Sequence, residues 1–147
     1  MQKFEVKGHE ASLLPDGEWR LVWNDEFDGT ELDRTKWDYR MSMMGKEWQA
    51  WTDEGVHLDG NSNAVFTLMM KNGRPVSSQL QTGYTYFVDG KEDGKITDFT
   101  SHRRNFILIS TEVKGYRYED HQPVKEAFDN IGDTFVVDHV RVFEREN

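Results

Sequence analysis

Short runs of β-branched and aromatic residues, each closed by a turn that contains glycine or aspartate, recur along this chain. Trp19, Leu21 and Trp23 alternate with other residues, which is the period of a strand with one buried face. Similar runs cover residues 64–70, 106–113 and 134–143. We find no convincing helix beyond short turns. Strands at this short spacing predict an all-β fold, an antiparallel β-sandwich.

Length and composition favour one domain and exclude several functions. The chain has 147 residues, and we expect a polar N-terminal segment over 1–18 and a single β-sandwich domain over 19–147. A formal net charge of −9 would repel a phosphate backbone, so we expect no nucleic-acid partner. No apolar run approaches the roughly 20 residues that a membrane span needs, and no secretory signal is visible, so we expect no membrane partner. The absence of cysteine rules out disulfides and thiolate metal sites.

Four segments, in order, resemble glycoside hydrolase family 16, the laminarinase, lichenase and agarase group. Residues 19–37 are similar to the opening strand and D-E-F-D-G turn of that family. Residues 47–52 (E-W-Q-A-W-T) and 56–68 are similar to its E-x-Q-x-Y-T loop and the strands that follow. Residues 86–91 (Y-F-V-D-G-K) match a hairpin, and 134–143 (T-F-V-V-D-H-V-R-V-F) match the closing strand. The resemblance implies a concanavalin A-like jelly roll that acts on β-glucans or galactans outside the cell or in the periplasm.

The chain lacks the segment that carries the catalytic carboxylates of that family. Residues 80–83 pass straight into 84–87, where the family has several strands, one with the motif E-x-D-x-x-E. A retaining glycosidase needs two carboxyl groups about 5–5.5 Å apart. The same spacing occurs once, at Glu26, Asp28 and Glu31, but in the segment that resembles a non-catalytic turn. We therefore expect a shortened jelly roll and identify no catalytic residue.

The resemblance implies two further sites. A structural Ca²⁺ ion would be held by the carboxylates of Glu26 and Asp138 and the carbonyl of Gly60, since calcium takes several oxygen ligands. The alternative for Asp138 is a buried carboxylate that accepts backbone N–H groups. Sugar contacts are expected from the tryptophan faces and guanidinium of one loop. Its residues are Arg40, Trp48 and Trp51. The alternative is that the two tryptophans only cover the core.

Three functional hypotheses remain open at this point. The chain is an inactive relative of the endo-β-glycanases that retains glycan binding, or an active glycosidase whose carboxylates lie elsewhere or come from a partner chain. The third hypothesis is a structural, oligomer-forming fragment. Because removing the middle of a sheet exposes unpaired edges and an apolar face, we predict self-association, or pairing with a chain that fills the gap.

Overall fold

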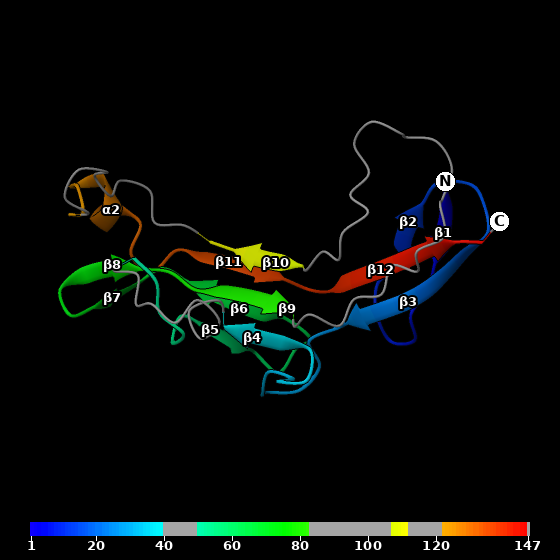
Figure 1. The fold of residues 1–147 in the computed structure, drawn as a ribbon, viewed down its shortest axis with the longest axis horizontal. Coiled ribbons are helices and arrows are strands. Elements are labelled where there is room, and N and C mark those ends of the chain that lie inside the picture. Colours follow the sequence, from blue (N-terminus) through cyan, green and yellow to red (C-terminus); the bar gives the residue numbers. More distant parts are fainter. Residues whose placement is uncertain (40–49, 83–106, 112–121, 147) are drawn as a thin grey trace.

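The structure is a computed structural model that describes residues 1–39, 50–82, 107–111 and 122–146. These residues form antiparallel strands and one short helix (Figure 1). The elements are β1 (Gln2–Phe4), β2 (Ser12–Leu14), β3 (Trp19–Asp25), β4 (Trp37–Tyr39), β5 (Val56–Leu58), β6 (Ala64–Thr67), β7 (Met69–Lys71), β8 (Arg74–Val76), β9 (Gln79–Thr82), β10 (Leu108–Ser110), α2 (Glu126–Asp129), β11 (Thr134–Val137) and β12 (Val140–Arg145). The predicted all-β fold class is confirmed. Within the described ranges, no helix has the length and apolar character that crossing a membrane requires.

Two three-stranded sheets enclose the hydrophobic core. One sheet has the order β10-β9-β4 and the other the order β11-β6-β5. The first sheet contributes Trp37, Leu80 and Ile109 to the buried core cluster, and the second contributes four residues of β5 and β6, which are Val56, Leu58, Ala64 and Phe66. Because alternate residues of a strand point to opposite faces, one face of each sheet supplies the core of a sandwich.

A hairpin connects the two sheets. β6 continues into β7, and β7 pairs with β8 around Asn72 and Gly73, whose φ angles of 51° and 75° are both positive. Such a pair of residues is typical of a tight turn between antiparallel strands. The chain then runs from β8 into β9, the central strand of the other sheet.

The first and last long strands form a separate pair. β3 and β12 are antiparallel from Val140 opposite Asp25 to Arg145 opposite Trp19. The run predicted as one strand over 134–143 is interrupted at Asp138 and His139. Before the break β11 pairs with β6, and after it β12 pairs with β3, so the chain changes partner there.

A turn at Asp33 returns the chain to the core. The side-chain carboxylate of Asp33 accepts hydrogen bonds from the backbone N–H and the hydroxyl of Thr35. The backbone carbonyl of Asp33 accepts the backbone N–H of Trp37. The Trp37 side chain, which is 1% exposed, donates its indole N–H to Asp25 over 2.6 Å. An aspartate cap therefore opens this turn, and Trp37 packs on the core.

The N-terminal segment packs on the same strand pair. β1 and β2 form an antiparallel hairpin, and the ring of Phe4 lies 4.9 Å from that of Phe143 in β12. The side chain of Gln2 donates to the carbonyl of Gly17. Residues 1–18 thus extend the β structure beyond the range 19–147.

Candidate functional site

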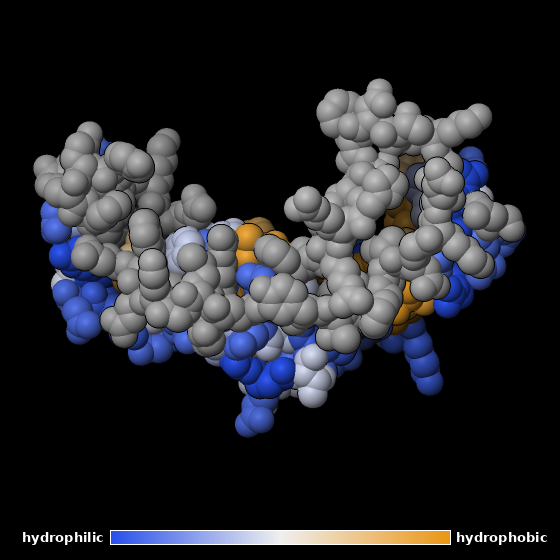
Figure 2. All heavy atoms as spheres, viewed as in Figure 1, coloured by the Kyte–Doolittle hydropathy of each residue, from blue (hydrophilic) through white to orange (hydrophobic). Residues whose placement is uncertain are grey.

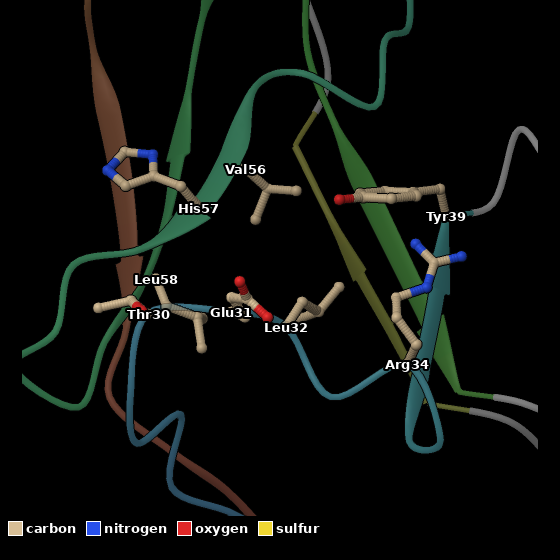
Figure 3. A pocket seen from close by; sticks show the side chains of 8 residues that line it. All are labelled: Thr30, Glu31, Leu32, Arg34, Tyr39, Val56, His57 and Leu58. Carbon is tan, nitrogen blue, oxygen red and sulfur yellow. The ribbon is translucent and has the colours of Figure 1, made fainter.

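A cavity of about 340 Å³ opens between the edge strands β4 and β5 (Figure 3). Its lining comes from the turn after β3 and from both strands. The lining residues are Thr30, Glu31, Leu32, Arg34, Tyr39, Val56, His57 and Leu58. Val56 and Leu58 are core residues, so the floor of the cavity is apolar. Figure 3 shows the Tyr39 hydroxyl directed toward Val56, whereas the His57 imidazole points away.

An arginine covers the aromatic wall of this cavity. The guanidinium carbon of Arg34 lies 4.6 Å from the centre of the Tyr39 ring, in a cation–π arrangement. Arg34 also forms an ion pair with Asp38, four residues further along the chain. Among the described residues, its other N–H groups have no hydrogen-bond partner. The cavity is therefore lined by an aromatic ring with a guanidinium stacked on one of its faces, and that guanidinium keeps N–H donors without a partner in the described part of the chain.

Carboxyl groups gather beside Arg34. Burial raises the pKa of Asp53, and the neighbouring Asp38 and Glu54 carboxylates add to this effect, while the Arg34 and Lys71 cations oppose it. A carboxyl group with a raised pKa close to a second carboxylate is the pattern that acid–base catalysis uses.

The face of β9 that points away from the core is polar. In the sheet register Gln81 lies opposite Asp38 on one side and Leu108 on the other. The amide of Gln79 donates to the Ser110 hydroxyl over 2.6 Å. Gln81 is 6% exposed, and its side chain has no hydrogen-bond partner among the described residues. A buried amide without a partner carries a free-energy penalty that a bound hydroxyl would relieve.

Of the three residues predicted to contact sugar, only Trp51 is among the described residues. Arg40 and Trp48 lie outside them. Trp51 is half-buried and forms an isolated parallel β-bridge with Ser77. The backbone N–H of the next residue, Thr52, donates to the Ser77 carbonyl over 2.8 Å. Tyr39 and Arg34 were not predicted. The chain order Arg34-x-x-x-Asp38-Tyr39 is the signal that could have indicated them.

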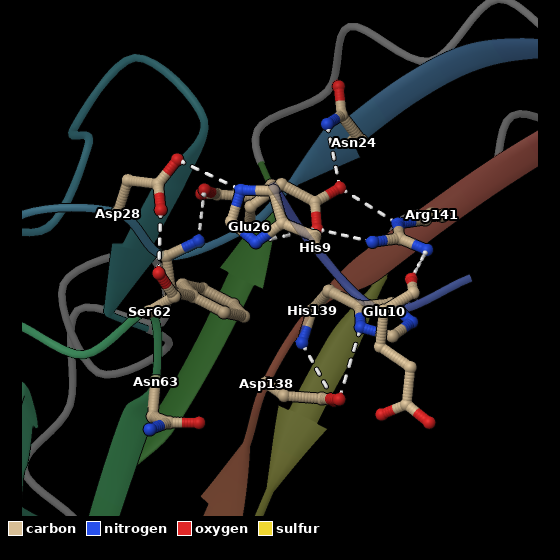
Figure 4. Close-up of polar contacts among 12 residues, drawn as sticks. His9, Glu10, Asn24, Glu26, Asp28, Ser62, Asn63, Asp138, His139 and Arg141 are labelled. Carbon is tan, nitrogen blue, oxygen red and sulfur yellow. Dashed lines mark hydrogen bonds and ion pairs between the residues drawn. The ribbon is translucent and has the colours of Figure 1, made fainter. Parts of the chain in front are cut away.

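Glu26 lies in a second polar cluster, at the end of β3 (Figure 4). Its two carboxylate oxygens accept hydrogen bonds from the Arg141 guanidinium, over 2.8 Å from Nε and 2.6 Å from Nη2. Asn24 donates a third over 2.9 Å. The two charged side chains are 6% and 1% exposed. Burial alone would raise the pKa of Glu26, but the hydrogen bonds from Arg141 and Asn24 outweigh it and lower the pKa to about 2.

The other two residues expected to bind calcium have different surroundings. The Asp138 side chain is 61% exposed, and its carboxylate accepts the backbone N–H of His139 over 2.9 Å. Gly60 lies in an exposed turn with a φ of 77°, near the Thr30 side chain. Among the described residues, no three His, Asp or Glu side chains form a group suited to a metal ion. While Glu26 is paired with Arg141, its oxygens do not fit a calcium site.

The three acids with the catalytic-type spacing have three different surroundings. Glu26 is paired with Arg141, and Glu31 lines the cavity. Asp28 accepts the Ser62 hydroxyl over 2.7 Å and lies 3.3 Å from Nε2 of His9. This arrangement gives no support to a shared catalytic role for the three.

Comparisons of this chain with protein families, with curated proteins and with solved structures found no match. The resemblance to glycoside hydrolase family 16 therefore stays a prediction from the residues. The function has to be inferred from the geometry of the cavity and its neighbours.

Proposed function

We propose that this protein binds oligosaccharides of the β-glucan or galactan type without cleaving them, as an inactive relative of glycoside hydrolase family 16. The observation that carries the proposal is the Tyr39 ring, with the Arg34 guanidinium stacked on one of its faces, in a cavity of about 340 Å³. A sugar ring has apolar C–H faces that pack on an aromatic ring, and hydroxyls that accept from a guanidinium. Ligand sites of this kind combine an apolar lining with a few polar groups.

The position of the cavity supports the same proposal. Tyr39 immediately precedes Arg40, and the described chain resumes at Ala50 and Trp51. The loop predicted to contact sugar therefore starts at the wall of the cavity.

Isothermal titration calorimetry with laminarin, lichenan and agarose oligosaccharides tests the proposal. Tyr39→Ala should weaken binding by about tenfold, which corresponds to the roughly 1.4 kcal/mol of one aromatic contact. Tyr39→Phe keeps the ring and should retain most of the affinity. Arg34→Gln should also weaken binding, whereas Arg20→Gln, an exposed arginine of β3 that pairs with Glu144, is the matched control. Absence of binding in the wild-type protein, or equal affinity in Tyr39→Ala, contradicts the proposal.

An active hydrolase is the second candidate, and the raised pKa of Asp53 beside Asp38 favours it. A protonated Asp53 would donate its proton to the leaving glycosidic oxygen, while a water molecule activated by the Asp38 carboxylate would attack the anomeric carbon. Release of reducing sugar from the same polysaccharides is the readout. Activity that disappears in both Asp53→Asn and Asp38→Asn, with the fold intact by circular dichroism, would establish this candidate over the inactive one.

A structural role through self-association is the third candidate. Phe135 and Val136 of β11 are 47% and 52% exposed, and Leu108 of β10 is 37% exposed. Both strands are sheet edges within the described part of the chain, and Figure 2 shows apolar atoms at the surface where they run. Exposed apolar edges favour pairing with another chain. Sedimentation velocity of the wild-type protein should reveal an oligomer, and a monomer at all accessible concentrations contradicts this role.

A further inference from the structure

We infer that the Arg141 guanidinium takes the place of the calcium ion that the family resemblance implies, so that a side chain rather than a metal joins the first and last strands. Calcium was expected to bridge Glu26, at the end of β3, and Asp138, just before β12. In the structure Arg141 of β12 already makes that connection to Glu26 (Figure 4). The inference does not depend on glycan binding.

The contacts of Arg141 join its own strand β12 to two other segments of the chain. Nε and Nη2 bind the two oxygens of Glu26, and Nη1 donates to the carbonyl of Glu10 over 2.7 Å and to the hydroxyl of Ser12 over 2.8 Å. Four hydrogen bonds thus radiate from one planar group. The N-terminal segment, β3 and β12 are held by the same charge, which is the role expected of a structural ion.

A calcium ion cannot share this arrangement. Calcium takes about six to eight oxygen ligands at roughly 2.3–2.6 Å. Both oxygens of Glu26 accept from Arg141, and an ion placed on them would have to displace a guanidinium whose side chain is 1% exposed. The displaced cation would then be buried without a partner, and two like charges would lie close together.

The neighbouring carboxylates cannot take the place of Glu26 as calcium ligands. Asp25 accepts the indole N–H of Trp37 and the backbone N–H of Phe27, and Nζ of Lys36 lies 3.7 Å away. Asp28 is exposed and faces His9. Both oxygens of Asp138 lie against His139, one at 2.9 Å from its backbone N–H and the other at 3.2 Å from Nδ1, and Gly60 lies in an exposed turn. These two residues are far from the set of oxygen ligands that calcium requires.

Calorimetry of the whole chain tests the inference. Differential scanning calorimetry of the wild-type protein should give the same unfolding temperature in millimolar CaCl₂ and in EDTA, within the scatter of replicates. Isothermal titration with CaCl₂ should show no stoichiometric binding. In Arg141→Ser the Glu26 carboxylate is free, so the unfolding temperature should fall and calcium should restore part of the loss. Asp28→Asn, a nearby exposed carboxylate, is the control for general charge effects.

The wild-type measurements decide the question even if Arg141→Ser does not fold. Stoichiometric calcium binding and a higher unfolding temperature in calcium, both lost in Glu26→Gln and Asp138→Asn, would overturn the inference. Calcium binding that persists unchanged in both variants would place the ion elsewhere and leave Arg141 as the connection at Glu26.

Discussion

The ion pair between Glu26 and Arg141 predicts how the stability of this protein depends on pH. The pKa of Glu26 in the folded protein is about 2, against an ordinary value of 4.5. At about 1.4 kcal/mol per pH unit, this difference corresponds to about 3 kcal/mol of folding free energy. Because the folded state holds the carboxylate ionised, this stability is fully present above pH 4.5 and is lost as the pH falls from 4.5 towards 2.

Glu26→Gln removes the charge and leaves the buried guanidinium of Arg141 without its partner. Breaking a buried pair in this way typically costs about 3–5 kcal/mol. We therefore expect a loss of about 3 kcal/mol at neutral pH, which lowers the unfolding temperature by roughly 6–12 °C in a domain of this size. Urea denaturation at neutral pH and at about pH 3 measures both effects, and the variant should lose less stability than the wild type between these pH values.

Glu31→Gln is the matched control, because Glu31 is exposed at the rim of the cavity and is not part of an ion pair in the described structure. It should leave the unfolding free energy within about 0.5 kcal/mol of the wild-type value. A wild-type free energy of unfolding in Glu26→Gln at neutral pH, or the full wild-type loss of stability in acid, would contradict this role of the ion pair.

Three further substitutions test the packing and the free edge. Trp37→Phe removes the indole donor to Asp25 and should cost about 1–3 kcal/mol in urea unfolding, since a buried carboxylate loses a partner; no measurable loss would contradict that account. Gly55→Ala places a Cβ 2.7 Å from the Ser78 hydroxyl and should cost about 1–3 kcal/mol by the same assay; an unchanged midpoint would show that the site has room. Phe135→Ser removes a half-exposed ring from β11 and should shift the sedimentation profile towards monomer at equal concentration; an identical profile would place the association elsewhere.

Local patterns in the sequence predict the parts of the fold that depend on neighbouring residues. The alternation of Trp19, Leu21 and Trp23 predicts β3, and the Asp33 cap with Trp37 predicts the turn that follows. Asn72 and Gly73 predict the hairpin between β7 and β8. In each case the residues that give the pattern are the same few residues that form the strand or turn. The prediction therefore needs no knowledge of distant partners.

The remaining features depend on partners that are distant in the sequence. The run 134–143 has an unbroken strand pattern, yet it divides at Asp138 because β11 and β12 pair with different strands. The contacts of Arg141 come from residues more than a hundred positions away. The expectation of calcium at Glu26 followed a family pattern, which does not show that an arginine already occupies both oxygens. The cavity at Tyr39 likewise appears only when β4 and β5 lie together.

The pairing of β3 with β12 has a consequence for how the chain folds during synthesis. β3 leaves the ribosome early, but its partner strand and the cation for Glu26 are made more than a hundred residues later. Until then this edge of the nascent chain has no partner and carries a carboxylate that must stay in water. Contacts this distant in sequence slow folding. We therefore expect the pairing of β3 and its buried ion pair to form only after translation has passed β12.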